Sequence, residues 1–468
     1  MTRPYELTLA GAAAAVAAGE LSPVELVESV LERVEAVEPR LNAFVTVLGE
    51  ESRAAAKEAE RALAGGGPVG PLHGVPVTLK DLFDVAGVRT TASSRLRADV
   101  PPASEDSTVA AGLRRAGAII IGKTHTHEFA YGMFTPQTHN PWNLDRSPGG
   151  SSGGSGAAVA ARMGMASVGT DTGGSVRIPS ALCGLVGLKP TYGRVARRGV
   201  VPLSWSLDHP GPLARTVEDA ALMMNAIAGP DPADPASVAA PVPDHTAQLG
   251  RGVEGLTLGV PAAYFEGADP ENAAAVRRAV DVLAAAGARI REVALPLIEY
   301  AVAAEGAILA TEAYAYHRRD LRDRPQLYSD VVRARLHSGE RITGADYVAA
   351  QRLRAALRDG WRDTFTEAGL DGLLAPALSG PAGLFGANEV HFTDGRVTTT
   401  SAAYSPQTYP TNMTGLPSLS VPCGFTADGM PIGLQVIGRP FAEPTVLRIA
   451  DAYESAAGWK DLAPPLDS

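Results

Sequence analysis

The hydrophobic positions of this chain follow a helical spacing at first and then gather into short buried runs. Ser22, Pro23 and Glu25 form a helix start, and apolar residues then recur every third or fourth position as far as residue 37. From residue 70 onward, compact apolar runs bounded by glycine alternate with amphipathic segments, which is typical of strands buried between helices. The pattern predicts an N-terminal helical segment over residues 1–65 and alternating strands and helices thereafter.

The later part of the chain contains no composition break long enough to be a linker, which favours one large domain over residues 1–468. We expect an α/β fold in which a single large mixed, mostly parallel twisted sheet is covered by helices on both faces. Residues 300–368 are expected to be a helical insertion that contributes to a substrate pocket. Strands are predicted at 74–81, 118–122, 166–170, 256–260, 288–293, 370–376, 418–425 and 431–438, the last two as a hairpin, and helices at 106–116, 157–165, 216–227, 271–286 and 445–456.

Composition and charge exclude several classes of protein. Hydrophobic residues make up 45% of the chain and charged residues 20%, as in ordinary globular proteins. The net charge is −10 and the basic residues are scattered, so we expect no nucleic-acid partner. Residues 7–18 are mostly alanine and glycine behind Glu6, which favours a helix over a signal peptide, and no transmembrane helix is expected. Two cysteines in so long a chain are not a disulfide scaffold, which favours the cytoplasm.

The most unusual segment is SPGGSSGGSGAAVAARMGMASVGTDTGGSVRIPS at residues 147–180, where glycine and serine crowd both ends of one helix-plus-strand unit. Flexible linkers have such a composition, but here each cluster lies beside apolar secondary structure. A nucleophilic hydroxyl needs a sharp turn after a strand, with free backbone N–H groups to bind a developing oxyanion. The second cluster therefore predicts Ser175 as a nucleophile, with an oxyanion hole formed by Thr172, Gly173, Gly174 and Ser175.

A nucleophilic serine also needs a base. The nine histidines offer no compelling partner, and the pair His125 and His127 lacks an obvious third ligand for a metal, so hydrogen-bonded structural histidines are favoured there. A lysine acts as a base when burial lowers its pKa enough to keep it neutral. Lys80 lies on an apolar predicted strand and suits that role.

Two further motifs match known patterns only formally. GAIIIGKT at residues 117–124 satisfies the phosphate-loop pattern, but its Ala-Ile-Ile-Ile core indicates a buried strand. GSSGG at residues 150–154 fits the nucleophile elbow of α/β-hydrolases, which would make Ser152 the nucleophile and would require an acid and a histidine later in the chain. Neither alternative is preferred over Ser175.

These motifs together resemble the amidase signature family. The resemblance is carried by PGGSSGGSGAAVAA, GTDTGGSVRIPSALCGLVGLKPTYGRV, GVPVTLKD, GKTHTHEFAYG, NPWN and NMTGLPSLSVPCGFTADGMPIGLQVIG, so it covers most of residues 20–460. It implies that Lys80 is the buried catalytic lysine, that Ser151 is a bridging serine held by a cis peptide bond, and that Ser175 is the nucleophile. The residues that would brace the loop are Ser152, Asp171 and Arg177.

The resemblance implies hydrolysis of a carboxylic amide to an acid and ammonia or an amine. Neutral Lys80 would take a proton from Ser151 while Ser151 takes one from Ser175, and water would then cleave the acyl-enzyme. Esters and carbamates are further candidate substrates, because an oxyanion hole does not read the leaving group. No metal or organic cofactor is expected. The expected partner is a small-molecule amide, with no nucleic acid and no membrane, and a homodimer is left open.

The acyl pocket is expected to involve residues 300–340 and 378–408 together with Tyr131, Met133 and Phe134. Their mixture of aromatic and aliphatic side chains favours a moderately apolar acyl group, although the tyrosines there could equally serve only to pack helices. One alternative function is that of the glutamine-hydrolysing subunit of a tRNA-dependent amidotransferase complex, because LVGLKPTYGRV is shared broadly. A non-catalytic homologue is disfavoured, because all three catalytic positions are intact.

Overall fold

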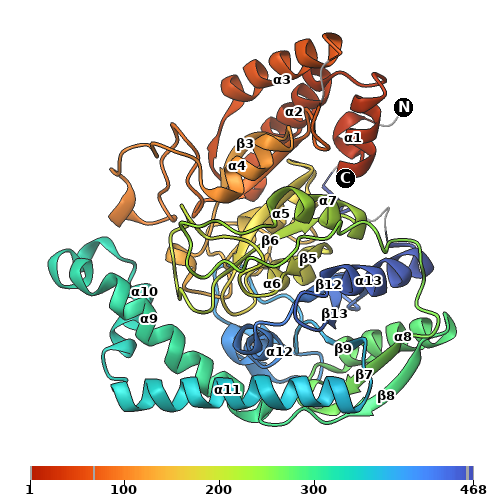
Figure 1. Cartoon of the computed structure of the whole chain (residues 1–468). Helices are drawn as coiled ribbons and strands as arrows, with labels where there is room; N and C mark the ends of the chain where they lie inside the picture. The colour runs from red at the N-terminus through yellow and green to blue at the C-terminus, as the bar shows by residue number, and fades with distance from the viewer. Residues whose placement is uncertain (1–2, 67–68, 460–462, 467–468) are drawn as a thin grey trace.

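One sheet of eleven strands runs through the computed structural model, which describes residues 3–66, 69–459 and 463–466 (Figure 1). Its strand order is β1-β3-β2-β4-β6-β5-β12-β13-β9-β7-β8. The strands are β1 (Phe44–Val47), β2 (Pro76–Lys80), β3 (Ile119–Thr124), β4 (Ala166–Asp171), β5 (Val186–Lys189), β6 (His209–Ala214), β7 (Thr257–Pro261), β8 (Arg289–Val293), β9 (Gly372–Pro376), β12 (Ser418–Phe425) and β13 (Pro431–Ile437). A separate small ribbon pairs β10 (Val390–His391) with β11 (Val397–Thr398).

The helices pack around this sheet, as the sequence pattern predicts. They are α1 (Leu9–Ala17), α2 (Pro23–Leu41), α3 (Gly49–Ala64), α4 (Thr108–Arg115), α5 (Gly153–Ala160), α6 (Arg177–Cys183), α7 (Val217–Ile227), α8 (Pro270–Ala285), α9 (Ala301–Asp323), α10 (Asp330–Gly339), α11 (Gly344–Glu367), α12 (Thr400–Thr414) and α13 (Glu443–Ala457). Short 3₁₀ turns are η1 (Pro4–Glu6), η2 (Arg95–Arg97), η3 (Glu128–Ala130), η4 (Ala262–Tyr264), η5 (Ile298–Tyr300) and η6 (Pro325–Leu327).

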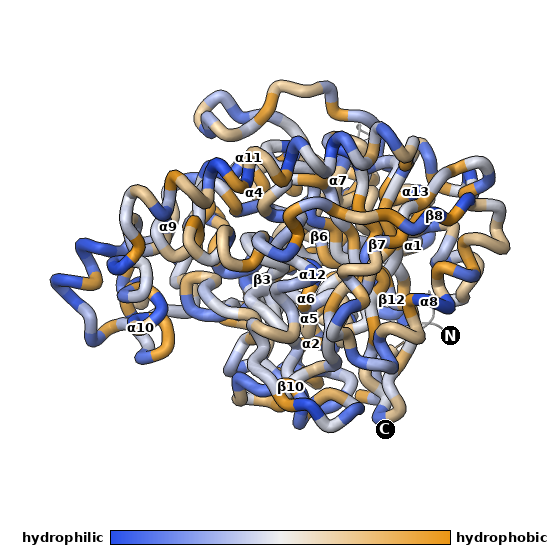
Figure 2. The backbone as a smooth tube through the Cα atoms, turned by 90° about the horizontal axis from the view of Figure 1, so that it is seen from below, coloured by the Kyte–Doolittle hydropathy of each residue, from blue (hydrophilic) through white to orange (hydrophobic). Residues whose placement is uncertain are grey.

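The two faces of the sheet carry different sets of helices. On one face α4, α7, α8 and α13 pack into the largest hydrophobic core, together with strand residues such as Val168 and Leu434. On the other face lie α5, α6 and α12, with α9 and α11 packed outside α12 (Figure 1). Figure 2 shows hydrophobic colour gathered around the central strands and much hydrophilic colour on the outlying α10. None of the helices in the described ranges is long and apolar enough to cross a bilayer.

The predicted mixed sheet is confirmed, but the expectation that it is mostly parallel is wrong. Among the described strands the parallel pairs lie in two groups, β3-β2-β4 and β9-β7-β8. Six antiparallel pairs make up the rest of the sheet. The sequence interpretation missed β5 and β6, the strands that create most of the antiparallel pairing at the centre.

Other local predictions fail for reasons visible in the fold. β1 lies inside the segment predicted to be entirely helical, and it is held by antiparallel pairing with β3 at the edge of the sheet. The α12 helix was not predicted because it contains Pro406 and Pro410, which local propensity disfavours in a helix interior. In contrast, Ile119–Thr124 is a fully buried strand, as predicted, and not a phosphate-binding loop.

The topology gathers chemically active residues at one edge of the sheet. β2 and β4 are parallel neighbours, so the ends of both strands, Lys80 and Asp171, lie at the same edge. Close approach of α5 to β4 at this edge requires a residue without a side chain: a Cβ on Gly169 would lie 2.7 Å from the Ser152 Oγ atom. The start of α5 is thereby packed directly onto the strand that leads to Ser175.

Candidate active site

Lys80 ends β2 with its side chain sealed inside the protein. Its Nζ atom donates to the Ser151 Oγ atom at 2.7 Å and to the Thr170 Oγ1 atom at 2.8 Å. All three side chains are almost completely buried. Burial lowers the pKa of Lys80 to about 7, although the negative charges of Asp208 and Asp171 oppose that shift. The amine is therefore substantially neutral near pH 7 and can accept a proton.

Ser151 lies in the turn before α5, where the Gly150–Ser151 peptide bond is cis. Its carbonyl oxygen accepts the His127 N–H at 3.0 Å and the Thr135 hydroxyl at 3.1 Å. The next residue links this turn to the nucleophile, because the Ser152 N–H donates to the Ser175 carbonyl at 3.3 Å. These bonds fix the Ser151 backbone, and the hydroxyl is left facing Lys80.

Ser152, the alternative nucleophile, does not face the cavity described below. Its hydroxyl donates to the Thr170 carbonyl at 3.3 Å, and its side chain is fully buried against β4. It therefore fastens α5 to β4.

The turn that carries Ser175 is organised by the Asp171 carboxylate. It accepts the backbone N–H of Gly174 at 2.8 Å, of Val176 at 3.2 Å and of Arg177 at 3.4 Å. The Arg177 guanidinium pairs with the same carboxylate at 2.9 Å. Although burial acts to raise it, the charge and hydrogen bonds of Arg177 hold the pKa of Asp171 well below its usual range. Asp171 is therefore ionised and ties both sides of the turn together.

Arg177 in turn anchors the turn to α12 and β13. Its nitrogens donate to acceptors contributed by Thr408, Thr411, Asn412 and Gln435. The guanidinium is completely buried and yet fully engaged, so the loop cannot move without breaking a charged network.

The amides of the turn are not all available to an oxyanion. The Gly174 N–H already donates to Asp171, whereas Thr172, Gly173 and Ser175 donate their backbone N–H groups to no acceptor in the described part of the chain. Thr172, Gly173 and Ser175 line a cavity, whereas Gly174 does not. The predicted four-amide hole is thus reduced to three candidate donors.

The cavity beside Ser175 has a volume of about 250 Å³. Of the three residues expected in the substrate pocket, Tyr131 and Met133 line this cavity. Phe134 does not: its backbone lies against Gly150, and its ring stands edge-on to His127 with ring centroids 5.6 Å apart. The remaining wall comes from α9, α10 and α12, from η3 and the residues that follow it, and from the loops near β4 and β6. The residues are Ala130, Gly132, Thr172, Gly173, Leu203, Gly306, Leu309, Ala310, Arg335, Ser338, Ser401 and Tyr409.

The relay is incomplete in one respect. Ser151 and Ser175 make no hydroxyl-to-hydroxyl hydrogen bond in this structure. The Ser175 side chain instead lies at the cavity wall, and the turn before α5 is joined to Ser175 through the backbone bond from Ser152. Catalytic hydrogen bonds are often long before substrate binds, so the absence of this bond is compatible with a proton relay from Ser175 through Ser151 to Lys80.

Comparison with known proteins places the chain in a family. The family model described as Amidase matches residues 25–447. The chain belongs to the amidase signature family. An amidase from Pseudomonas putida is 48% identical over 469 residues, covering 100% of this chain and 99% of that protein. A glutamyl-tRNA(Gln) amidotransferase subunit from Roseiflexus sp. (strain RS-1) is 43% identical over 497 residues, covering 100% of this chain and 99% of that protein.

Solved structures agree with this assignment. The native peptide amidase from Stenotrophomonas maltophilia has a TM-score of 0.87 and 30% identity, with 100% of each chain covered. The predicted family, the mixed sheet covered by helices and the enzyme class, an amidase acting on linear carbon–nitrogen bonds, are confirmed.

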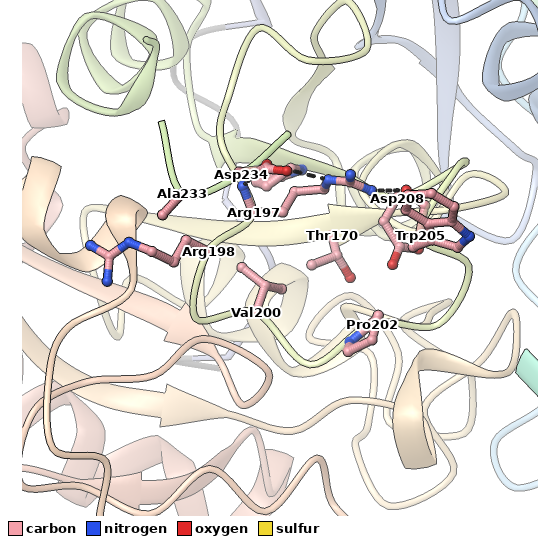
Figure 3. A pocket seen from close by; sticks show the side chains of 10 residues that line it. Thr170, Arg197, Arg198, Val200, Pro202, Trp205, Asp208, Ala233 and Asp234 are labelled. Carbon is pink, nitrogen blue, oxygen red and sulfur yellow. Dashed lines mark hydrogen bonds and ion pairs between the residues drawn. The ribbon is translucent and has the colours of Figure 1, made fainter. Parts of the chain in front are cut away.

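A second cavity of this amidase, about 190 Å³, is lined by Thr170 among other residues (Figure 3). The Thr170 hydroxyl also accepts a hydrogen bond from the Lys80 amine at 2.8 Å. Asp208 also lines this second cavity and accepts the Thr172 hydroxyl at 2.6 Å. Sequence reasoning missed both residues. The period-two alternation of β4 could have found Thr170, since it places Thr170 and Asp171 on opposite faces of the strand.

The histidine pair of the amidase, His125 and His127, is largely buried. His125 Nδ1 lies 3.2 Å from the Ser93 hydroxyl and 3.0 Å from the Gln137 amide nitrogen. Burial lowers the pKa of His127 to about 3, so its ring is neutral. Within the described ranges, no group of three or more His, Cys, Asp or Glu side chains is arranged to hold a metal ion.

Proposed function

We propose that this amidase hydrolyses a carboxylic amide to an acid and ammonia or an amine through an acyl-enzyme on Ser175, with Lys80 and Ser151 as the proton relay. The observation that carries the proposal is the buried Lys80 amine, which lies 2.7 Å from the Ser151 hydroxyl and has a pKa of about 7. A lysine with an ordinary pKa near 10.4 would be almost entirely charged at neutral pH and unable to act as a base.

The first step begins when substrate brings the Ser175 hydroxyl into hydrogen-bonding distance of Ser151. Ser175 gives its proton to Ser151 as Ser151 gives one to Lys80, and the Ser175 Oγ atom attacks the amide carbonyl carbon. The resulting oxyanion accepts hydrogen bonds from the N–H groups of Gly173 and Ser175, with Thr172 as a third donor. These N–H groups have no acceptor within the described part of the chain, so they can donate to the oxyanion without breaking another hydrogen bond.

The second half of the reaction runs the relay in reverse. Protonated Lys80 returns its proton through Ser151 to the leaving nitrogen, and the carbon–nitrogen bond breaks to leave the acyl-enzyme. Water then gives a proton to the relay, attacks the acyl carbon and releases the acid with Ser175 restored. Each step uses side chains of this chain alone. Esters and carbamates present the same carbonyl and are included as candidate substrates.

Cysteine burial and the placement of α9 and α10 support the remaining assignments. Both cysteines, Cys183 and Cys423, are free and buried, which suits the reducing cytoplasm.

We propose a single amidase domain over residues 1–468, in which residues 300–368 contribute Gly306, Leu309 and Arg335 to the cavity wall. A small-molecule amide is the proposed partner, and a homodimer remains open.

A second candidate function follows from the relatives named as a subunit of glutamyl-tRNA(Gln) amidotransferase. In this alternative the same triad hydrolyses glutamine, and a partner protein receives the ammonia. The two functions separate in one assay: glutamine hydrolysis by the purified chain, alone and with candidate partner proteins, compared with hydrolysis of simple amides.

The proposed chemistry is tested with Ser175→Ala and Lys80→Met on a panel of amide, ester, carbamate and glutamine substrates. We expect each variant to lose at least about 1,000-fold in kcat, because nucleophile and base act as a unit. Lys57→Met, which removes an exposed lysine on α3, is the matched control and should keep wild-type rates. Undiminished turnover by Ser175→Ala would refute the mechanism. Trapping of an acyl group on Ser175, detected by mass spectrometry, would support it directly.

A further inference from the structure

A cavity of about 720 Å³, which we call the α11 cavity, lies away from the catalytic residues. Its wall comes chiefly from α11, from residues 191–192 and 414–416, and from residues 439–441 after β13. α11 runs alongside α12, as Figure 1 shows. The α11 cavity and the cavity beside Ser175 have no lining residue in common among the described residues. Small-molecule sites have volumes of about 300–1,000 Å³, so the α11 cavity is large enough for a ligand of its own.

Four arginines give the wall of the α11 cavity an excess of positive charge. Arg354, Arg358 and Arg362 are four positions apart on α11, and Arg439 follows β13. Asp359 is the only acidic residue that lines the cavity within the described ranges. Residues four positions apart lie on the same face of a helix, where like charges repel one another and destabilise the helix. A bound anion would relieve this repulsion.

Other cavities of the protein have balanced charges. Two arginines and two aspartates line the cavity of Figure 3. Glu266 and Arg396 are the charged residues of a cavity beside the β10–β11 ribbon, among the residues that the structure describes. The α11 cavity instead has three more positive than negative charges, in a chain whose net charge is −10. The positive excess is therefore specific to this cavity and not a property of the whole chain.

Two of the four arginines have guanidinium groups that a ligand can use. Arg358 is exposed and makes no hydrogen bond or ion pair within the part of the chain that the structure describes. Arg362 pairs with Asp359 at 2.8 Å and with Asp363 at 3.2 Å, and all three of these side chains are exposed. Exposed ion pairs are weak, so Arg362 can exchange its partners for a more highly charged anion.

The other two arginines are held in place by neutral acceptors. Arg354 donates to the Met413 carbonyl at 2.9 Å, and Arg439 donates to two backbone carbonyls at 2.8 and 2.9 Å. Neither forms an ion pair among the described residues, so both keep their positive charge uncompensated. The carbonyls at the end of α12 would repel an anion, but those of Met413 and Leu416 already accept hydrogen bonds from Arg354 and Lys189. The cavity thus combines two fixed guanidinium groups with two that are free to move.

We propose that the α11 cavity binds a small ligand that carries two or more linked phosphate groups. A phosphate group carries about −1.5 to −2 charges at pH 7, so two such groups balance the three excess positive charges of the wall. The planar guanidinium group is suited to phosphate because it can donate two parallel hydrogen bonds to its oxygens. Arg354 and Arg362 are ~12 Å apart along the helix axis, at about 1.5 Å per residue, and their long side chains can converge on linked phosphates between them. This site is separate from the proposed amidase chemistry at Ser175.

The test is a calorimetric titration of the full-length protein at physiological ionic strength, where weak surface attraction is screened. The probes are orthophosphate, pyrophosphate, triphosphate and adenosine diphosphate. We expect saturable binding of pyrophosphate or triphosphate at least about tenfold tighter than that of orthophosphate. Adenosine diphosphate that binds more tightly than pyrophosphate would assign the site to organic phosphate esters, and the reverse order would assign it to inorganic polyphosphates. Citrate is the control for charge alone, and citrate that binds as tightly as pyrophosphate would overturn the assignment to phosphate.

Substitutions of the exposed arginines place the ligand in the α11 cavity. Arg358→Gln and Arg362→Gln should each weaken pyrophosphate binding by about tenfold, and Arg358→Lys should recover part of the affinity because it keeps the charge. Arg352→Gln is the matched control, since Arg352 is an exposed arginine of α11 that does not line the cavity. Thermal unfolding of each variant checks that the fold is intact. Unchanged affinity in both Arg358→Gln and Arg362→Gln would overturn the inference.

A last variant separates the α11 cavity from the cavity beside Ser175. Arg335 is a half-buried arginine at the wall of the Ser175 cavity, where an anion could also bind. Arg335→Gln should leave the affinity for pyrophosphate within about twofold of wild type. Loss of binding in Arg335→Gln would place the anion beside Ser175 and overturn the inference, as would the absence of saturable binding of every phosphate probe. Because binding is measured directly, these outcomes do not depend on whether the protein hydrolyses amides.

Discussion

The rate of this enzyme should depend on pH through Lys80, which must be neutral to accept a proton. Because burial lowers the pKa of Lys80 to about 7, half of the amine is neutral at that pH. From the titration of one group, about 1% is neutral at pH 5 and about 90% at pH 8. We expect kcat/KM to rise about tenfold per pH unit up to pH 6, to bend near pH 7, and to be level above pH 8.

Asp208 provides a perturbation of known sign. Its negative charge is the largest influence that raises the pKa of Lys80 against burial. Asp208→Asn removes that charge while keeping an oxygen that can accept the Thr172 hydroxyl. The pKa of Lys80 should therefore fall further, and the bend in kcat/KM should move to lower pH. Asp171→Asn should also lower the pKa of Lys80, but it leaves the Arg177 guanidinium without its ion-pair partner, so it is the less specific test.

The assay is kcat/KM from pH 5 to pH 9.5 with a neutral amide, so that the substrate itself does not titrate. Circular dichroism at each pH checks that the protein stays folded. His127 has a pKa of about 3, so it does not account for a bend near 7. A flat profile, a bend near pH 4 or one above pH 9 would refute a buried lysine base. Movement of the bend to higher pH in Asp208→Asn would refute the electrostatic explanation.

Three further predictions concern stability and the turn around Ser175. The pKa of Lys80 is about 7 when folded and ~10.4 when unfolded, so between these pH values the unfolded chain binds more protons and the stability of the wild-type protein rises with pH. The cost of burying Lys80 as a neutral amine is roughly 5 kcal/mol in all, and Lys80→Met removes it. Lys80→Met should therefore be most stabilising relative to wild type at pH 7 and less so at pH 10. Gly173→Ala should lower kcat at least about tenfold, because its Cβ would lie 2.5 Å from the Tyr409 ring and displace an oxyanion donor. Asp171→Asn should lower the free energy of unfolding by about 3–5 kcal/mol, because it leaves the Arg177 charge buried and unpaired.

Each of these predictions has a control and a result that would contradict it. For Lys80, thermal unfolding of wild type and Lys80→Met is compared from pH 7 to pH 10. A difference in stability between the two proteins that stays constant with pH would contradict the prediction. Gly344→Ala has nothing within 4 Å of the added carbon and should keep wild-type kcat; equal rates for both glycine variants would contradict the packing argument. Asp359→Asn, measured by urea unfolding, removes an exposed partner of Arg362 and should change the free energy of unfolding far less than Asp171→Asn does. Equal effects of the two substitutions would contradict the buried-pair argument.

Local sequence patterns predicted the elements that depend mainly on their own residues. The helix start at Ser22 is confirmed, with the hydroxyl accepting the Val24 N–H. The β12–β13 hairpin is also confirmed. In each case the signal comes from groups within a few residues of one another, which is the range over which capping and turn chemistry act.

The elements that local patterns missed are held by distant partners. β6 has the sequence HPGPLA, in which two prolines and a glycine disfavour a strand, yet β4 and β5 pair with it on both sides. α12 keeps its helix around Pro406 and Pro410 because it packs against α6, α9 and α11. Burial in the tertiary structure outweighs local propensity at these positions.

The sequence by itself determined which residue types could do the chemistry: a serine in a glycine-rich turn after a strand, a second serine at the start of a helix and a lysine on an apolar strand. Only the tertiary structure decided their distances, because residues 71 positions apart meet when β2 and the start of α5 pack at one edge of the sheet. It also decided that Gly174 donates its N–H to Asp171 and that Arg335 reaches the cavity without an acidic partner among the described residues. Hydrogen bonding, burial and charge pairing depend on neighbours in space, which local sequence patterns do not specify.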